Sequence, residues 1–150
     1  LYSEHDFPTI KVFSDSPLAF ESSKVYLRNK KLLNAEAREF MSENESLFDF
    51  ENFQFLESSK ASKAVSDYNE PCIIISSSGM VQGGRVEHHV AANIGNPYCT
   101  ILMIGYCAEG TLGWRLLHGQ ETLGIKGKEH QVLAKVERID VFSGHGDRDD

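Results

Sequence analysis

The sequence predicts an α/β fold, in which a mainly parallel, Rossmann-like sheet has helices on its flanks. Two observations support this prediction. Short apolar runs, of which Cys72–Ser76 (CIIIS) is the clearest, are typical of central strands that are covered on both faces. Segments with apolar side chains at helical spacing alternate with these runs. The 150 residues have the length of one domain and are enough to bury a hydrophobic core.

The first predicted strand ends near Ser14 and is followed at once by a helix. Asp15 and Ser16 have the residue types of helix caps, and Pro17 fits the first helical turn. The remaining elements of the first half are a helix, a short strand inside an aromatic-rich loop, and a short helix, predicted at residues 32–44, 53–56 and 59–69.

The second half begins with the central strand Cys72–Ser76. One helix is predicted from about Gly84 to Gly95, and a shorter one ends at Gly119. Apolar runs predict three more strands, at residues 99–106, 121–127 and 131–142. Because strands and helices alternate, we expect the strand-to-helix loops along one edge of the sheet, where ligands bind in such folds.

Composition and charge restrict the function classes. The chain has 15 Lys and Arg against 22 Asp and Glu, a net charge of -7, which argues against a free-standing nucleic-acid binder. No apolar run approaches the ~20 residues that span a bilayer, so no membrane partner is expected. The three cysteines form no CxxC pair, which favours a reducing, cytoplasmic compartment over a disulfide framework or zinc knuckle.

Three predicted strands end in small, polar or glycine-rich loops, with the sequences SSSGMVQGGR, GYCAEGTLG and FSGHGD. Serine hydroxyls and glycine amides donate hydrogen bonds, and a following helix N-terminus adds partial positive charge, so these loops favour an anion. Arg85 adds a group that can bind phosphate oxygens in a bidentate manner.

Each loop also has a purely structural interpretation. Glycines after a strand commonly form turns, and GMVQGGR lacks both the Lys-Ser/Thr of a P-loop and the GxGxxG spacing. Arg85 could pair with Glu87 instead of a ligand. His88 and His89 are adjacent and point to different helix faces, so they are not a metal pair. The isolated histidines are interpreted as structural: His5, His118 and His130.

His145 differs from the other histidines because it lies between Gly144 and Gly146, where the backbone can turn sharply and approach a ligand. Imidazole titrates near neutrality, so a loop histidine that faces an anion can donate a proton to a leaving oxygen. Asp147 follows two residues later and could orient the loop. The loop therefore offers a candidate general acid.

Four segments, SDSPLA, IIISSSGMVQGGRVEHH, GYCAEGTLGWRLLHG and IDVFSGHGD, are together similar to the β-CASP region of the metallo-β-lactamase-superfamily nucleases. These include the endonuclease subunit of the messenger-RNA 3′-processing complex, its archaeal and bacterial relatives and, more distantly, ribonuclease J. The resemblance extends from about Ile10 to Asp147 and is weak across residues 27–68. It implies a cassette that caps a dinuclear zinc site, with RNA in the cleft between the cassette and a metallo-β-lactamase domain.

The resemblance also implies roles for individual residues. His145 matches the family's histidine that reaches the scissile phosphate and assists proton transfer. The positions that match substrate-facing residues are Ser76, Ser77, Ser78, Gly79, Gly83, Gly84, Arg85 and Ser143. Gly144 and Gly146 replace alanines that are usual in the family, and Trp114 stands where a small or basic residue is usual.

Other parts of the family's active site are absent from these 150 residues. The sequence lacks the zinc-binding HxHxDH signature, the upstream acidic motif and the final histidine motif. We therefore expect no metal ligand or cofactor in this chain, and two zinc ions in the full-length protein. Residues 1–150 are interpreted as a β-CASP domain from a longer protein whose metallo-β-lactamase domain lies elsewhere in the same polypeptide. A homodimer is left open.

These observations leave three functional hypotheses. The first is the β-CASP part of a zinc-dependent ribonuclease that hydrolyses phosphodiester bonds through metal-activated water, the isolated chain itself being inactive. The second is a catalytically idle paralogue that binds RNA or serves in assembly. The third is an independent nucleotide-binding α/β domain, which tight binding of ATP or NAD would reveal.

Overall fold

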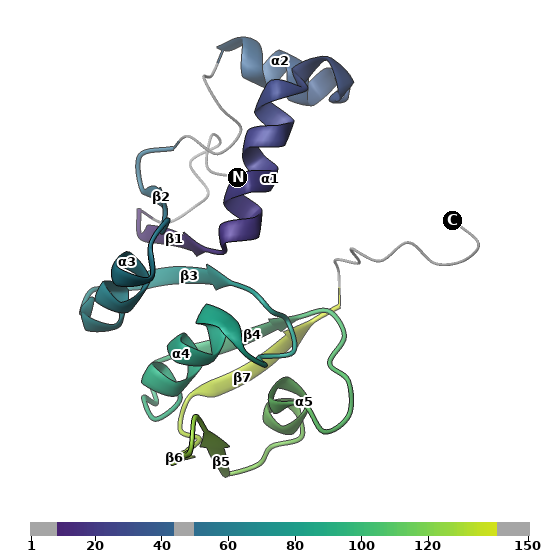
Figure 1. Ribbon diagram of the computed structural model, residues 1–150. Helices are drawn as coiled ribbons and strands as arrows, with labels where there is room; N and C mark the ends of the chain where they lie inside the picture. The colour runs from purple at the N-terminus through teal and green to yellow at the C-terminus, as the bar shows by residue number, and fades with distance from the viewer. Residues whose placement is uncertain (1–8, 44–49, 141–150) are drawn as a thin grey trace. The chain divides into compact units, whose positions relative to one another are not determined.

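The computed structural model describes residues 9–43 and 50–140. The chain forms two compact units, Leu1–Ile75 and Ser76–Asp150. Strands and helices alternate within both, and the strand pairs β1–β2 and β4–β7 run parallel (Figure 1). The predicted α/β class, with parallel strands and flanking helices, is confirmed. Within the described ranges, no helix combines the length and the apolar character that crossing a bilayer requires.

The first unit is built on a three-stranded sheet in the order β2–β1–β3, formed by Phe53–Phe55, Lys11–Asp15 and Cys72–Ser76. The β1 strand pairs with β2 so that Val12 lies opposite Phe53. Phe13 faces the other way and packs with Leu56 and Val65 in a small core. The Phe13 ring also meets the Tyr68 ring edge-on, with centroids 5.4 Å apart. This core holds the segment after β2 against the sheet.

Local capping determines where the helices of this unit begin. The Ser16 hydroxyl accepts a hydrogen bond from the Ala19 amide, as predicted, and Ser58 accepts one from Ala61. The Ser16 cap precedes α1 (Pro17–Arg28), and the Ser58 cap precedes α3 (Ser59–Ala64). Between them lies α2 (Ala35–Glu43). Two short 3₁₀ turns accompany them, at Lys30–Leu32 and Val65–Asp67.

The described part of the second unit contains two helices and four strands: α4 (Gly84–Asn93), β4 (Thr100–Ile104), α5 (Leu112–Leu117), β5 (Thr122–Ile125), β6 (Lys128–Gln131) and β7 (Lys135–Ile139). Figure 1 shows β4 and β7 side by side. Their parallel register runs from Thr100 opposite Lys135 to Ile104 opposite Ile139. Both strands therefore end at the same edge.

One hydrophobic core joins both helices to β4 and β5 in this unit. It includes Met103 from β4, Val90 from α4, Ile94 directly after α4, Leu116 from α5 and Ile125 from β5. Ile94 has no exposed surface. Because β4 and the loop residue Cys107 both contribute side chains to this cluster, the core holds β4 and the loop that follows it in place.

The structure differs from the sequence-based expectation in three places. The strand Cys72–Ser76, expected to be central and covered on both faces, instead lies at the end of the order β2–β1–β3, and its Ile75 is 53% exposed. The described strands form three separate sheets, and the third is an antiparallel hairpin of β5 and β6 that was not expected. Its two-residue turn has positive φ at Lys126 (50°) and Gly127 (76°), the backbone of a tight hairpin turn. The strand expected from residue 131 begins only at Lys135, because the amides of Leu133 and Ala134 both donate to the Ile94 carbonyl.

Candidate functional site

The loop between β3 and α4 contains most of the residues predicted to face substrate. Five of them are exposed: Ser77, Ser78, Gly79, Gly83 and Gly84. Ser76 ends β3 and Arg85 lies in the first turn of α4, and both are half-buried. The two ends of the loop approach each other, since a Cβ on Gly84 would lie 3.5 Å from the Ser77 carbonyl oxygen. The structure thus brings these predicted residues together in one compact turn.

Val81 anchors this loop in the core of the second unit. Its side chain is only 2% exposed and packs in the main hydrophobic cluster. Its backbone nevertheless has a φ of 55°, a left-handed conformation that is unfavourable for a β-branched residue. Such a conformation persists only where the surrounding structure enforces it, and it is concentrated at functional sites. The loop is therefore held in a defined shape rather than a relaxed one.

The N-terminus of α4 already has an internal anion beside it. The Gly83 amide donates a hydrogen bond to Glu87 Oε2 over 3.1 Å. A carboxylate at this position satisfies one of the free amides of the helix and interacts favourably with its dipole. The Gly83 amide is therefore already bonded within the chain. Ser77 and Ser78 are exposed on the same loop, and the Ser78 hydroxyl donates a long hydrogen bond, 3.4 Å, to the Gln82 carbonyl.

A second loop, Gly105–Thr111, follows β4 and is bonded to the first. The buried Cys107 thiol donates to the Gly79 carbonyl, with 3.4 Å between Sγ and oxygen. The Gly113 amide, at the start of α5, donates to the Met80 carbonyl over 2.9 Å. Burial raises the pKa of the Cys107 thiol, an effect that Arg138 partly opposes. The thiol therefore keeps its proton, and its role as donor, at neutral pH.

These two loops meet at the edge where β4 and β7 end. A Cβ on Gly79 would lie 3.6 Å from the carbonyl oxygen of Ile104, the last residue of β4. Ile104 is paired with Ile139, the last residue of β7, and the Gly105 amide donates to the Ile139 carbonyl over 3.4 Å. The carboxyl ends of two parallel strands and two glycine-rich loops thus form one edge, the place where α/β folds bind ligands.

Two of the predicted site residues cannot be placed. Ser143 and His145 lie outside the described residues, as do Gly144, Gly146 and Asp147. The assignment of His145 as a general acid therefore stays a prediction.

Four of the other histidines, His88, His89, His118 and His130, lie within the described residues, and His5 lies outside them. His89 is buried and His88 half-buried on neighbouring positions of α4, with ring centroids 5.8 Å apart. His118 stacks on Trp114, with centroids 3.9 Å apart, and its Nδ1 lies 2.8 Å from the Trp114 carbonyl oxygen. Across residues 9–43 and 50–140, no group of three or more His, Cys, Asp or Glu side chains is arranged to hold a metal ion.

Sequence reasoning missed Cys107 and Gly113, which hold the two loops together. Both lie in the segment GYCAEGTLG that the sequence singled out, but no sequence pattern indicated their partners, and the Cys107–Gly79 bond spans 28 positions of the chain. The one available signal was a glycine inside a segment with helical spacing, because such a glycine often has a packing reason.

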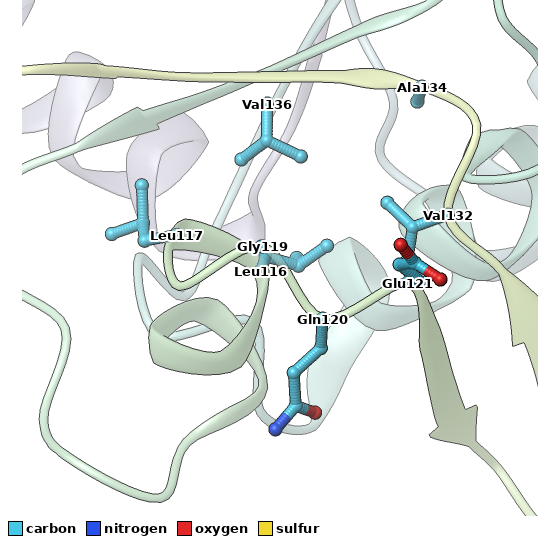
Figure 2. Close-up of a pocket in the computed structure, with 8 residues that line it drawn as sticks. All are labelled: Leu116, Leu117, Gly119, Gln120, Glu121, Val132, Ala134 and Val136. Atoms are coloured by element: carbon cyan, nitrogen blue, oxygen red, sulfur yellow. The ribbon is translucent and has the colours of Figure 1, made fainter.

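A hollow of about 300 Å³ lies elsewhere in the second unit, between α5 and the segment that leads into β7. Figure 2 shows its mostly apolar lining, formed by Leu116, Leu117, Gly119, Gln120, Glu121, Val132, Ala134 and Val136. None of these is a predicted site residue. The hollow is therefore not part of the candidate site.

Parallel strand pairs, flanking helices and paired loops at the strand ends are the features of an α/β fold. The Beta-Casp domain family matches residues 1–116, and the chain belongs to this family. The resemblance predicted from the sequence motifs is confirmed.

Three relatives illustrate the range of similar proteins. Ribonuclease TTHA0252 from Thermus thermophilus is 27% identical over 146 residues, covering 97% of this chain and 34% of the relative. Transcription termination factor FttA from Methanosarcina mazei is 29% identical over 147 residues, covering 94% and 23%. An RNase J-like protein from Methanocaldococcus jannaschii is 40% identical over 93 residues, covering 62% and 22%. The chain thus spans about a third or less of the length of each.

Proposed function

We propose that this chain is the β-CASP region of a zinc-dependent, metallo-β-lactamase-fold nuclease that hydrolyses RNA phosphodiester bonds. The observation that carries the proposal is the pair of bonded loops at the carboxyl ends of β4 and β7, in a chain of the Beta-Casp family. Two of the relatives have names that refer to ribonuclease activity, which supports RNA as the substrate. The metallo-β-lactamase domain would belong to the same polypeptide, and the cytoplasm is the proposed location.

In this proposal the loop after β3 binds the RNA backbone. The exposed hydroxyls of Ser77 and Ser78 would donate to phosphate oxygens, and Arg85 would supply the positive charge. The remaining proposed contacts come from Ser76, Gly79, Gly83, Gly84 and Ser143. Because Glu87 already accepts the Gly83 amide, the glycines would chiefly let the backbone approach the RNA closely.

His145 would act as the general acid. Its protonated imidazole would give one proton to the leaving oxygen while the phosphorus–oxygen bond breaks. The oxygen of a water molecule would form the new bond to phosphorus, and that water would release one proton to solvent. Among the described residues, no cluster of metal ligands is present that could hold zinc. The two zinc ions of the proposed nuclease would be bound by residues of the metallo-β-lactamase domain.

The experiment that tests this proposal is an RNA cleavage assay on the full-length protein. A 5′-labelled single-stranded RNA should be cut into shorter products, and a chelator should abolish the reaction. Binding of the RNA without cleavage would instead favour the idle paralogue. Tight binding of ATP or NAD, with no binding of RNA, would favour the nucleotide-binding domain.

A further inference from the structure

We infer that Cys107 and Gly113 are positioning residues for the loop Ser76–Arg85, and that they fix it by binding two consecutive carbonyl groups, those of Gly79 and Met80. This inference rests on the proposed function, because it takes RNA binding as the task of the loop. Neither residue is proposed to touch RNA.

The two hydrogen bonds come from different elements. Cys107 lies in the loop after β4 and donates its thiol proton to Gly79, while Gly113 lies in α5 and donates its amide proton to Met80. Two consecutive carbonyls held from two elements leave the peptide group between them little freedom to rotate. Gly79 directly follows the exposed Ser78, whose hydroxyl donates to the Gln82 carbonyl of the same loop over 3.4 Å. The bonds to Gly79 and Met80 therefore fix the backbone on which that hydroxyl is carried.

Gly113 is required by packing rather than by backbone conformation. It is buried within α5, and a Cβ at this position would lie 2.9 Å from Cys107 Sγ, 2.9 Å from Met103 Cε and 3.0 Å from the Met80 carbonyl oxygen. Real Cβ atoms are essentially never found below 3.0 Å from such neighbours. A side chain here would push apart the very groups that hold the loop.

Cys107 has the properties of a buried donor. It is 7% exposed and belongs to the main hydrophobic core, so its position is fixed by packing as well as by its bond to Gly79. A loop that already has its binding conformation loses less conformational entropy when the ligand binds. Loosening it should therefore weaken RNA binding more than it slows bond cleavage, which is the signature that separates positioning from chemistry.

The test measures KM and kcat for RNA cleavage in the full-length protein. We expect Gly113→Ala to raise KM about tenfold, because small displacements of positioning groups have effects of this order or larger. Cys107→Ala should raise KM about threefold, as expected for the loss of one weak hydrogen bond. In both variants kcat should stay within about twofold of wild type. Cys107→Ser keeps a donor of similar size and should restore the wild-type KM.

Two matched controls come from the same unit. Gly124→Ala places a methyl group where a Cβ meets nothing within 4 Å. Cys99→Ala removes a thiol that donates to the Asn93 side chain and not to the loop. Both should leave KM unchanged. Hydrogen exchange at residues 76–85 should be faster in Gly113→Ala and Cys107→Ala than in either control.

The inference is overturned if Cys107→Ala leaves KM unchanged. It is also overturned if Cys107→Ser has a KM as high as that of Cys107→Ala. Both results can be obtained even if Gly113→Ala fails to fold. A wild-type protein that does not cleave RNA would contradict the proposed function instead. In that case hydrogen exchange still decides whether these residues hold the loop: faster exchange in Cys107→Ala supports it, and wild-type exchange refutes it.

Discussion

The Ser62 hydroxyl donates a hydrogen bond to the Asp15 carboxylate, with 2.5 Å between Oγ and Oδ2. Both residues are almost fully buried, with 1% of Asp15 and 3% of Ser62 exposed. Asp15 is the last residue of β1 and Ser62 lies in α3, so one polar contact ties a helix to the end of a strand in the first unit.

Ser62→Ala should lower the free energy of unfolding by about 1–3 kcal/mol, because it removes a hydrogen-bond donor from a buried carboxylate. Urea unfolding of the purified protein measures this change. The control is Ser59→Ala, three residues earlier on an exposed position of the same helix, which should change stability by less than about 0.5 kcal/mol. Equal stability of the two variants would show that the Asp15–Ser62 contact contributes nothing.

Cys107 should titrate above its ordinary pKa of 9.0 in the folded protein, because burial disfavours the thiolate. The pH profile of its alkylation by iodoacetamide, followed by peptide mass mapping, should therefore have a higher midpoint in native protein than in urea. Since the unfolded chain loses this proton at lower pH, stability should fall as pH rises through the interval between the two midpoints. If the alkylation midpoints in native protein and in urea were equal, burial would not raise the pKa of the Cys107 thiol.

Arg85 should contribute to RNA affinity in the full-length protein through a charge-assisted contact. We expect Arg85→Ala to weaken binding about tenfold and to reduce the slope of log affinity against log salt by about 1. Arg85→Lys, which keeps the charge but loses the planar fork, should be intermediate. Arg28→Ala, at the exposed end of α1, serves as the control. A salt slope that Arg85→Ala leaves unchanged would exclude a phosphate contact.

The isolated chain should carry no stoichiometric zinc, because tetrahedral sites need clustered ligands and the described residues contain no such cluster. Elemental analysis of protein freed from chelator should give well below one zinc ion per chain. One or two ions per chain would mean that this segment builds a metal site by itself.

The features that the sequence predicted correctly are those decided by neighbouring residues. The cap at Ser16, the helix start at Pro17 and the apolar strand Cys72–Ser76 all depend on local hydrogen bonding or on an uninterrupted apolar run. The β6 strand, Lys128–Gln131, was missed because its residues are polar and show no apolar alternation. It becomes a strand by pairing with β5 across a tight turn.

In the candidate site too, local features could be predicted from the sequence and contacts between distant residues could not. Glycines and serines marked the loop after β3, but its attachment to Cys107 and Gly113 depends on contacts between distant parts of the chain. Asp15 illustrates the same limit, since the sequence suggests a helix cap and the structure shows a buried partner of Ser62. Packing between distant segments, rather than local pattern, decides these roles.

The substitution His145→Ala in the full-length protein examines the proposed general acid. RNA cleavage should fall by about 10²–10⁴-fold, the usual contribution of a general acid or base, while zinc content, RNA affinity and Tm stay at wild-type values. His130→Ala, in the β5–β6 hairpin, is the matched control and should cleave RNA normally. Normal cleavage by His145→Ala together with a lowered Tm would contradict the catalytic role and leave a histidine that only stabilises its loop.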